Sequence, residues 1–251
     1  MRALILSDIH ANLEALTAVL TAANGQADVL WNLGDMVGYG ASPNEVIDLI
    51  RPASALIVRG NHDRVCCGLT SALGFNPVAR AAAIWTQNEL TSDHLAWLRE
   101  VPQGPIKIED HTISCAHGSP LNEDQYILNM RDAWAPLQQM GTAITFIGHT
   151  HIQGGFSQRD HDWYELRPRM ERGNHAAQWT MPIPEGTRHL INPGSVGQPR
   201  DHDWRAAYAI YDSEAAEIVF HRVPYDLTAA QGRILMAGLP ERLAERLREG
   251  R

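Results

Sequence analysis

The chain has 251 residues, 44% of them hydrophobic, and it carries a net charge of −8. This length and composition are typical of a globular protein with one large core, so we expect a single domain over residues 1–251. The negative charge argues against broad binding to duplex nucleic acid, because such binding needs many lysine and arginine contacts with phosphates.

The sequence contains no pattern typical of a secretory leader or a membrane span. The first apolar run ends at Ser7-Asp8, too early for a signal peptide, and no run reaches the roughly 18 apolar residues of a spanning helix. The three cysteines, Cys66, Cys67 and Cys115, match no zinc-ribbon spacing. We expect them to be reduced and packed in the interior, which favours a cytoplasmic protein.

Apolar runs alternate with helical patterns in the first hundred residues. They predict strands at 3–6, 29–33 and 53–58, a helix within 9–22, and helices from 42 onward, at 75–88 and at 92–100. Ser42-Pro43-Asn44-Glu45 is a capping-box pattern with Ser42 as N-cap, and Thr91 is the expected cap of the 92–100 helix. This alternation predicts a largely parallel sheet whose ligands bind beyond the carboxyl ends of its strands.

The pattern changes after Pro102, where short apolar segments predict a mixed second sheet facing the first. Predicted strands lie at 105–109, 112–116, 143–147, 153–157, 163–166, 189–191, 206–211 and 217–221, and predicted helices at 131–140, 227–236 and 241–248. Asp110-His111 reads as a hairpin turn. The segment 167–186 is rich in prolines and charges, and we expect a surface loop or a small cap there.

One five-residue pattern occurs twice. Arg159-Asp160-His161-Asp162-Trp163 recurs as Arg200-Asp201-His202-Asp203-Trp204, each time before a predicted strand. Two polar hairpin turns of similar composition would explain the repetition. The alternative is that at least one copy borders a functional site and supplies an arginine to a phosphate group.

Five short polar motifs follow predicted strands. In chain order they are Asp8-Ile9-His10, Gly34-Asp35, Gly60-Asn61-His62-Asp63, Ala116-His117-Gly118 and Gly148-His149-Thr150-His151. Each motif alone is common in turns and on surfaces. Together they place imidazole, carboxylate and amide groups at one edge of a sheet, and this mixed ligand set suits Mn, Fe, Zn or Ni better than Mg or Ca.

These five motifs, in this order, resemble those of the calcineurin-like metallophosphoesterase superfamily. The resemblance covers residues 1–151 and extends to Asn192-Pro193-Gly194-Ser195, which is similar to a loop in small bacterial and archaeal members. It implies an α/β fold, in detail a four-layer αββα sandwich of two mixed β-sheets flanked by helices.

The resemblance also implies a centre with two divalent metal ions. One ion would be held by Asp8, His10, Asp35 and His151, and the other by Asp35, Asn61, His117 and His149. Asp35 would bridge the two ions. Such a centre activates water for attack on a phosphate ester and stabilises both the attacking and the leaving oxygen.

His62 is the expected catalytic acid, which would protonate the leaving oxygen, and Asp63 is expected to orient its imidazole. A helix cap is the alternative role for Asp63. Three further residues are candidate substrate contacts: Arg59 and Arg200 could bind phosphate oxygens, and Tyr39 could stack on a leaving group. A surface salt bridge for Arg59 and simple packing for Tyr39 are the alternatives.

The expected function is metal-dependent hydrolysis of phosphate mono- or diesters with a small phosphorylated substrate. A serine/threonine protein phosphatase and a dinucleoside polyphosphate hydrolase are alternatives in the same superfamily. A catalytically silent partner-binding scaffold is the non-enzyme alternative, although the presence of His62 and all seven predicted ligands favours an enzyme. The sequence gives no indication of the oligomeric state.

Overall fold

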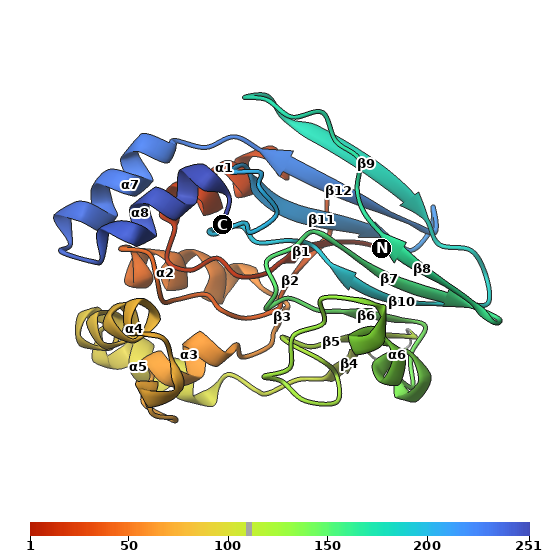
Figure 1. Cartoon of the computed structure of the whole chain (residues 1–251), viewed down its shortest axis with the longest axis horizontal. Helices are drawn as coiled ribbons and strands as arrows, with labels where there is room; N and C mark the ends of the chain where they lie inside the picture. Colours follow the sequence, from red (N-terminus) through yellow and green to blue (C-terminus); the bar gives the residue numbers. More distant parts are fainter. Residues whose placement is uncertain (109–111) are drawn as a thin grey trace.

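Two mixed β-sheets lie face to face between helices in this computed structural model, which describes residues 1–108 and 112–251 (Figure 1). This arrangement confirms the predicted αββα sandwich. The predicted turn at Asp110-His111 lies outside the described residues.

The first sheet has the strand order β3-β2-β1-β11-β12-β9. Its strands are β1 (Arg2–Leu6), β2 (Val29–Asn32), β3 (Leu56–Ile57), β9 (Ala177–Pro182), β11 (Ala206–Asp212) and β12 (Glu217–Val223). β1, β2 and β3 run parallel, with Leu6 opposite Asn32 in the register of the first pair. The loops that follow these three strands therefore leave the sheet at the same edge.

The second sheet has the order β4-β5-β6-β10-β7-β8. Its strands are β4 (Ile106–Ile108), β5 (Ile113–Cys115), β6 (Ile144–Phe146), β7 (Gly154–Arg159), β8 (Asp162–Leu166) and β10 (Thr187–Asn192). β5, β6 and β10 are parallel neighbours, whereas β4, β7 and β8 pair antiparallel. The loops after β5 and β6 carry the remaining histidine motifs.

Helices cover the outer faces of both sheets. They are α1 (Leu13–Ala22), α2 (Pro43–Ala53), α3 (Asn61–Cys66), the 3-10 helix η1 (Ala72–Gly74), α4 (Pro77–Glu89), α5 (Ser92–Glu100), α6 (Met130–Gln139), α7 (Leu227–Met236) and α8 (Glu241–Glu249). Leu16 of α1 and Leu247 of α8 belong to the same core cluster as Leu6 of β1. α6 packs its buried Leu137 with Leu190 of β10 on the other side of the sandwich. Among the described residues, no helix combines the length and the apolar character needed to cross a membrane.

The space between the sheets is filled by large side chains from facing strands. Ile5 and Trp31 of the first sheet share a buried cluster with Phe146 and Ile191 of the second. These four residues lie on strands whose following loops carry polar residues, so the apolar packing that joins the sheets also fixes the position of those loops.

Three local expectations differ from the structure. Residues 177–182, expected as loop or cap, form the edge strand β9, which pairs antiparallel with β12. The Ser42 side chain makes no capping hydrogen bond, although the helix does begin at Pro43. The turn expected at 60–63 opens directly into α3, while Thr91 caps α5 as predicted by accepting from the His94 N–H.

Candidate metal centre

The loops at the facing sheet edges bring all seven predicted ligands together. Asp8 and His10 follow β1, Asp35 follows β2, and Asn61 begins α3, whereas three histidines come from the second sheet. The side chains form two groups of close metal-binding atoms, Asp8, His10, Asp35 and His151, and Asp35, His117 and His149. Asp35 belongs to both groups, as the predicted bridge requires.

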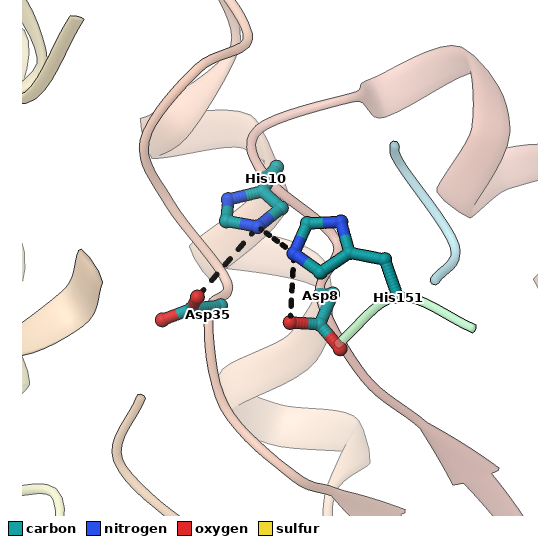
Figure 2. Close-up of side chains that lie close together, drawn as sticks. All are labelled: Asp8, His10, Asp35 and His151. Atoms are coloured by element: carbon teal, nitrogen blue, oxygen red, sulfur yellow. Dashed lines mark hydrogen bonds and ion pairs between the residues drawn. The ribbon is translucent and has the colours of Figure 1, made fainter. Parts of the chain in front are cut away.

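The first group is compact and buried (Figure 2). His10 Nε2 lies 3.2 Å from His151 Nε2 and 3.6 Å from an Asp35 carboxylate oxygen, and His151 Nε2 lies 3.3 Å from an Asp8 oxygen. Two imidazole nitrogens and two carboxylates thus converge on one point from three separate loops.

Backbone carbonyls fix which nitrogen of each histidine faces this point. His10 Nδ1 donates to the Val37 carbonyl at 3.1 Å, and His151 Nδ1 donates to the Gln198 carbonyl at 2.6 Å. With the proton on Nδ1, each ring presents the lone pair of Nε2 to the other. Two lone pairs at this separation repel unless a cation lies between them, so the donor set fits a metal ion.

The second group is built in the same way. His117 Nδ1 donates to the Leu33 carbonyl at 2.8 Å, which leaves Nε2 to face Asp35 at 3.4 Å and the Asn61 side-chain oxygen at 3.2 Å. His149 has the opposite orientation, because its Nε2 contacts the Asp124 carbonyl at 3.3 Å and Nδ1 remains for a ligand. The exposed Tyr126 ring stacks on His149 with centroids 4.0 Å apart, a contact that no sequence motif indicated.

Burial and charge shift the ionisation of these groups strongly. Burial raises the pKa of Asp8 to about 7, against the opposing effect of His117. Burial alone would lower the pKa of His117, but the Asp35 and Asp8 carboxylates outweigh it and raise that pKa to about 10. Burial lowers the pKa of His149 to about 3. At neutral pH the His117 ring is therefore protonated, whereas the rings of His149 and of the other two histidine ligands are neutral.

Backbone strain is concentrated at the ligands. Positive φ angles between 50° and 67° occur at Asp8, His10, Asp35, His149 and His151. Such angles are uncommon outside glycine and persist where the surrounding structure enforces them, often at functional sites. Gly60 permits the close approach of two of these loops, since a Cβ there would lie 2.3 Å from the Asp35 backbone nitrogen.

His62 lies beside the first group of predicted ligands but is not one of them. Its ring centroid is 4.9 Å from that of His10, 4.4 Å from that of Tyr39 and 4.5 Å from that of Phe75. Nδ1 is buried without a hydrogen-bond partner among the described residues, and burial lowers the pKa of this imidazole to about 4. The position suits a proton donor at the edge of the centre, and that role stays a prediction.

Asp63 does not orient His62, so the predicted contact between them is wrong. The Asp63 carboxylate instead accepts backbone N–H groups from Gly60 at 3.0 Å, Asp35 at 2.8 Å, Met36 at 2.9 Å and Val37 at 3.2 Å. It thereby caps α3 and ties that helix to the loop that carries Asp35.

The candidate substrate contacts fall into two places. Arg200 borders the first group, where its backbone N–H donates to the His151 carbonyl at 3.2 Å and its Cζ lies 5.8 Å from the Tyr39 ring centroid. Tyr39 is 7% exposed and packs against His10 and His62, which agrees with the packing alternative and leaves little ring surface for stacking. The Arg59 backbone N–H donates to the Pro102 carbonyl at 2.8 Å. Among the described residues, Arg59 has no hydrogen bond or ion pair with the predicted ligands.

The two copies of the repeated pattern have different roles. Residues 159–163 span the hairpin between β7 and β8, with the turn at 160–161 and Arg159 opposite Asp162. Residues 200–204 lie beside the metal centre, and here Asp201 pairs with Arg222 while Asp203 pairs with Arg205. Arg246 also approaches this place, with its Cζ 5.8 Å from the Tyr39 centroid, and no sequence motif indicated it.

Comparisons with known proteins agree with the geometry. A sequence profile of the calcineurin-like phosphoesterase superfamily domain matches residues 1–216. An uncharacterized protein of Methanocaldococcus jannaschii is 36% identical over 253 residues, covering 98% of this chain and 97% of that protein. A metallophosphoesterase structure from Sphaerobacter thermophilus has a TM-score of 0.85 at 40% identity, covering 100% of this chain and 99% of that one. A hypothetical protein from Pyrococcus horikoshii OT3 has a similar fold, with a TM-score of 0.76 at 22% identity and 100% and 98% coverage.

Proposed function

The chain belongs to the calcineurin-like phosphoesterase superfamily, and on that premise we propose that it hydrolyses esters of a small phosphorylated substrate with two divalent metal ions. The observation that carries this proposal is the shared carboxylate of Asp35, because one of its oxygens, Oδ2, lies 3.6 Å from His10 Nε2 and 3.4 Å from His117 Nε2 in two adjoining groups. A single structural ion would need only one of these groups.

The residues present fit two ions. Asp8, His10, Asp35 and His151 would hold one, and Asp35, Asn61, His117 and His149 the other. The three Nδ1–H groups that donate to backbone carbonyls direct the Nε2 atoms of His10, His117 and His151 inward before any ion binds, and His117 would release its Nε2 proton to a metal ion. When bound, Mn, Fe, Zn or Ni ions at such sites polarise a phosphoryl group and stabilise charge on the attacking and leaving oxygens.

The protein's own groups then complete the reaction. His62 is proposed to donate a proton to the leaving oxygen, because it lies beside His10 without being a ligand. Arg200 is proposed to bind a phosphoryl oxygen, since it lies at the edge of the same group. The strained loops hold these groups in place before the substrate arrives, so little reorganisation is needed.

The proposal includes the cellular compartment of the protein and the kind of substrate that it binds. Cys66, Cys67 and Cys115 are all buried and unpaired, which supports the expected reducing cytoplasm. The net charge of −8 supports a small substrate whose phosphate is bound by metal ions and a few arginines, in place of an extended nucleic-acid duplex.

The test is hydrolysis of p-nitrophenyl phosphate and bis-p-nitrophenyl phosphate by protein that is stripped of metal and then supplied with Mn, Ni, Zn or Mg. Turnover that depends on added metal supports the proposal. A preference for the diester identifies a phosphodiesterase and a preference for the monoester a phosphatase. Activity equal in the presence of a chelator, or silence with every metal on both substrates, would contradict it.

A further inference from the structure

Two arginines flank one tyrosine at the border of the metal centre. The guanidinium carbons of Arg200 and Arg246 each lie 5.8 Å from the centroid of the Tyr39 ring. That ring is itself 4.7 Å from the ring of the predicted ligand His10 and 4.4 Å from His62. Both arginines therefore lie beside the same aromatic ring, which itself packs against the proposed catalytic groups.

The two arginines come from distant parts of the chain. Arg200 belongs to the loop before β11, and Arg246 belongs to α8, which lies with α7 on the same side of the sandwich as α1 (Figure 1). Gly250 at the end of α8 receives the backbone N–H of His202 at 2.9 Å, so the helix end and the loop are joined directly. α8 therefore forms part of this border of the metal centre.

Neither guanidinium forms an ion pair with an Asp or Glu side chain among the described residues. Arg200 donates to the Gln198 side chain at 3.0 Å, and Arg246 donates to the main-chain oxygen of the last residue, Arg251, at 2.7 Å. The Nε atom of Arg200 is buried and has no hydrogen-bond partner in the described part of the chain. By contrast, Arg205, Arg222, Arg233 and Arg242 each contact a carboxylate.

The two arginines repel each other. Burial, and then the neighbouring charge of Arg200, lower the pKa of Arg246, against the opposing effect of Tyr39. Substrate phosphate oxygens would reduce this repulsion, because the guanidinium fork matches phosphate oxygens in geometry and charge.

We propose that Arg246 forms an anion subsite for a second phosphate group of the substrate, next to the phosphate that is cleaved and that Arg200 contacts. The site then favours substrates with two neighbouring phosphates, such as diphosphates, over substrates with one. This inference rests on the proposed function for the cleavage step, but the binding that it predicts can be measured separately.

The test compares binding of inorganic phosphate and pyrophosphate by calorimetry at one fixed free Mn²⁺ concentration. The proteins are the unmodified chain, Arg246→Gln, Arg246→Lys and the control Arg248→Gln. Arg248 is exposed on the same helix and contacts Gln231 at 3.4 Å, so its replacement removes the same charge away from Tyr39. Chelation of free metal by pyrophosphate is identical for all four proteins and cancels from the comparison.

The expected result is that Arg246→Gln weakens pyrophosphate binding by at least about tenfold more than it weakens phosphate binding. Arg246→Lys should restore part of this difference, and Arg248→Gln should behave as the unmodified chain. An equal loss for both anions, or the same loss in Arg248→Gln, would overturn the subsite. If the differential loss occurs in a protein that hydrolyses neither nitrophenyl ester, the subsite stands and the proposed function falls.

Discussion

The Nε2 atoms of His10 and His151 face each other at 3.2 Å, while the Nδ1–H of each ring donates to a backbone carbonyl. In this tautomer neither Nε2 can donate to the other, so the pair is repulsive in the metal-free protein. Protonation offers no relief at neutral pH, because burial holds the pKa of both rings well below the usual value. A bound cation turns this repulsion into coordination.

Metal binding should therefore stabilise the fold. At a free Mn²⁺ concentration roughly a hundred times its dissociation constant, about 3 kcal/mol is gained. For a chain of this size the gain raises Tm by about 5–10 °C. Scanning calorimetry of the protein with chelator and then with Mn²⁺ measures the shift. Identical melting curves in the two conditions would contradict a metal site at these histidines and carboxylates.

Loss of the shared carboxylate should affect both ions, whereas loss of a ligand from one group should affect one. Asp35→Asn is expected to reduce the bound metal from two ions per chain towards zero, and His151→Gln to reduce it to about one. Elemental analysis after gel filtration counts the ions. Asp48→Asn is the control, since this exposed carboxylate contacts the buried His94 at 3.0 Å and belongs to neither group of ligands. Equal losses in Asp35→Asn and His151→Gln would contradict a bridge.

The proposed role of His62 predicts a dependence on the leaving group. A poor leaving group such as the phenolate of phenyl phosphate needs protonation more than 4-nitrophenolate does. His62→Ala should thus lower kcat by about 10²–10⁴-fold for phenyl phosphate and clearly less for p-nitrophenyl phosphate. Metal content must stay unchanged, because His62 is not a ligand. A uniform loss on both substrates would assign His62 to positioning instead of proton donation.

Asp63 should be a stability residue. Its buried carboxylate accepts four backbone N–H groups, and Asp63→Asn would turn an amide donor towards some of them. We expect a loss of about 3 kcal/mol in the free energy of unfolding, measured by urea denaturation. Asp132→Asn is the matched control, because the half-buried Asp132 accepts a single backbone N–H from Leu128 at 3.0 Å. A change below about 0.5 kcal/mol in Asp63→Asn would show that the four bonds contribute little.

The predicted ligands lie close together in the structure for a physical reason that can be recognised in the sequence. Asp8 and Asp35 follow parallel neighbouring strands, and the carboxyl ends of such strands share one edge of the sheet. The same rule brought His117 and His149 together after β5 and β6. A strand pattern, a motif and a parallel pairing were enough to place these side chains.

Other features depended on contacts that no local pattern encodes. Arg246 lies on a helix whose sequence is simply amphipathic, and only its packing beside the loop of Arg200 gives it a role. β9 differs in this respect, because Ala177, Trp179 and Met181 alternate with the exposed Gln178 and Thr180, a strand pattern that the surrounding prolines and charges obscured. The positive φ angles of the ligands are imposed by the surrounding loops, and glycine was the only visible sign of tight turns.

A buried histidine away from the centre should make stability depend on pH. His189 is 2% exposed and contacts the Ser157 hydroxyl through Nδ1 at 2.6 Å. Burial lowers its pKa from 6.5 to about 4. Between these values the unfolded chain binds more protons at this site than the folded chain, so the free energy of unfolding falls as pH is lowered from about 6.5 to 4. The contribution is at most about 3 kcal/mol and vanishes above pH 7.

Replacing His189 with Gln should remove this contribution while keeping a polar side chain for the neighbouring hydroxyls. Urea denaturation at pH 7 and pH 5, with chelator in all samples, gives the drop in unfolding free energy for each protein. The drop should be smaller in His189→Gln than in the unmodified chain by about 1–2 kcal/mol, because pH 5 covers only part of the window. His161→Gln, in the exposed turn between β7 and β8, should leave the drop unchanged. A drop of the same size in all three proteins would mean that His189 binds its proton equally well in the folded and unfolded chain.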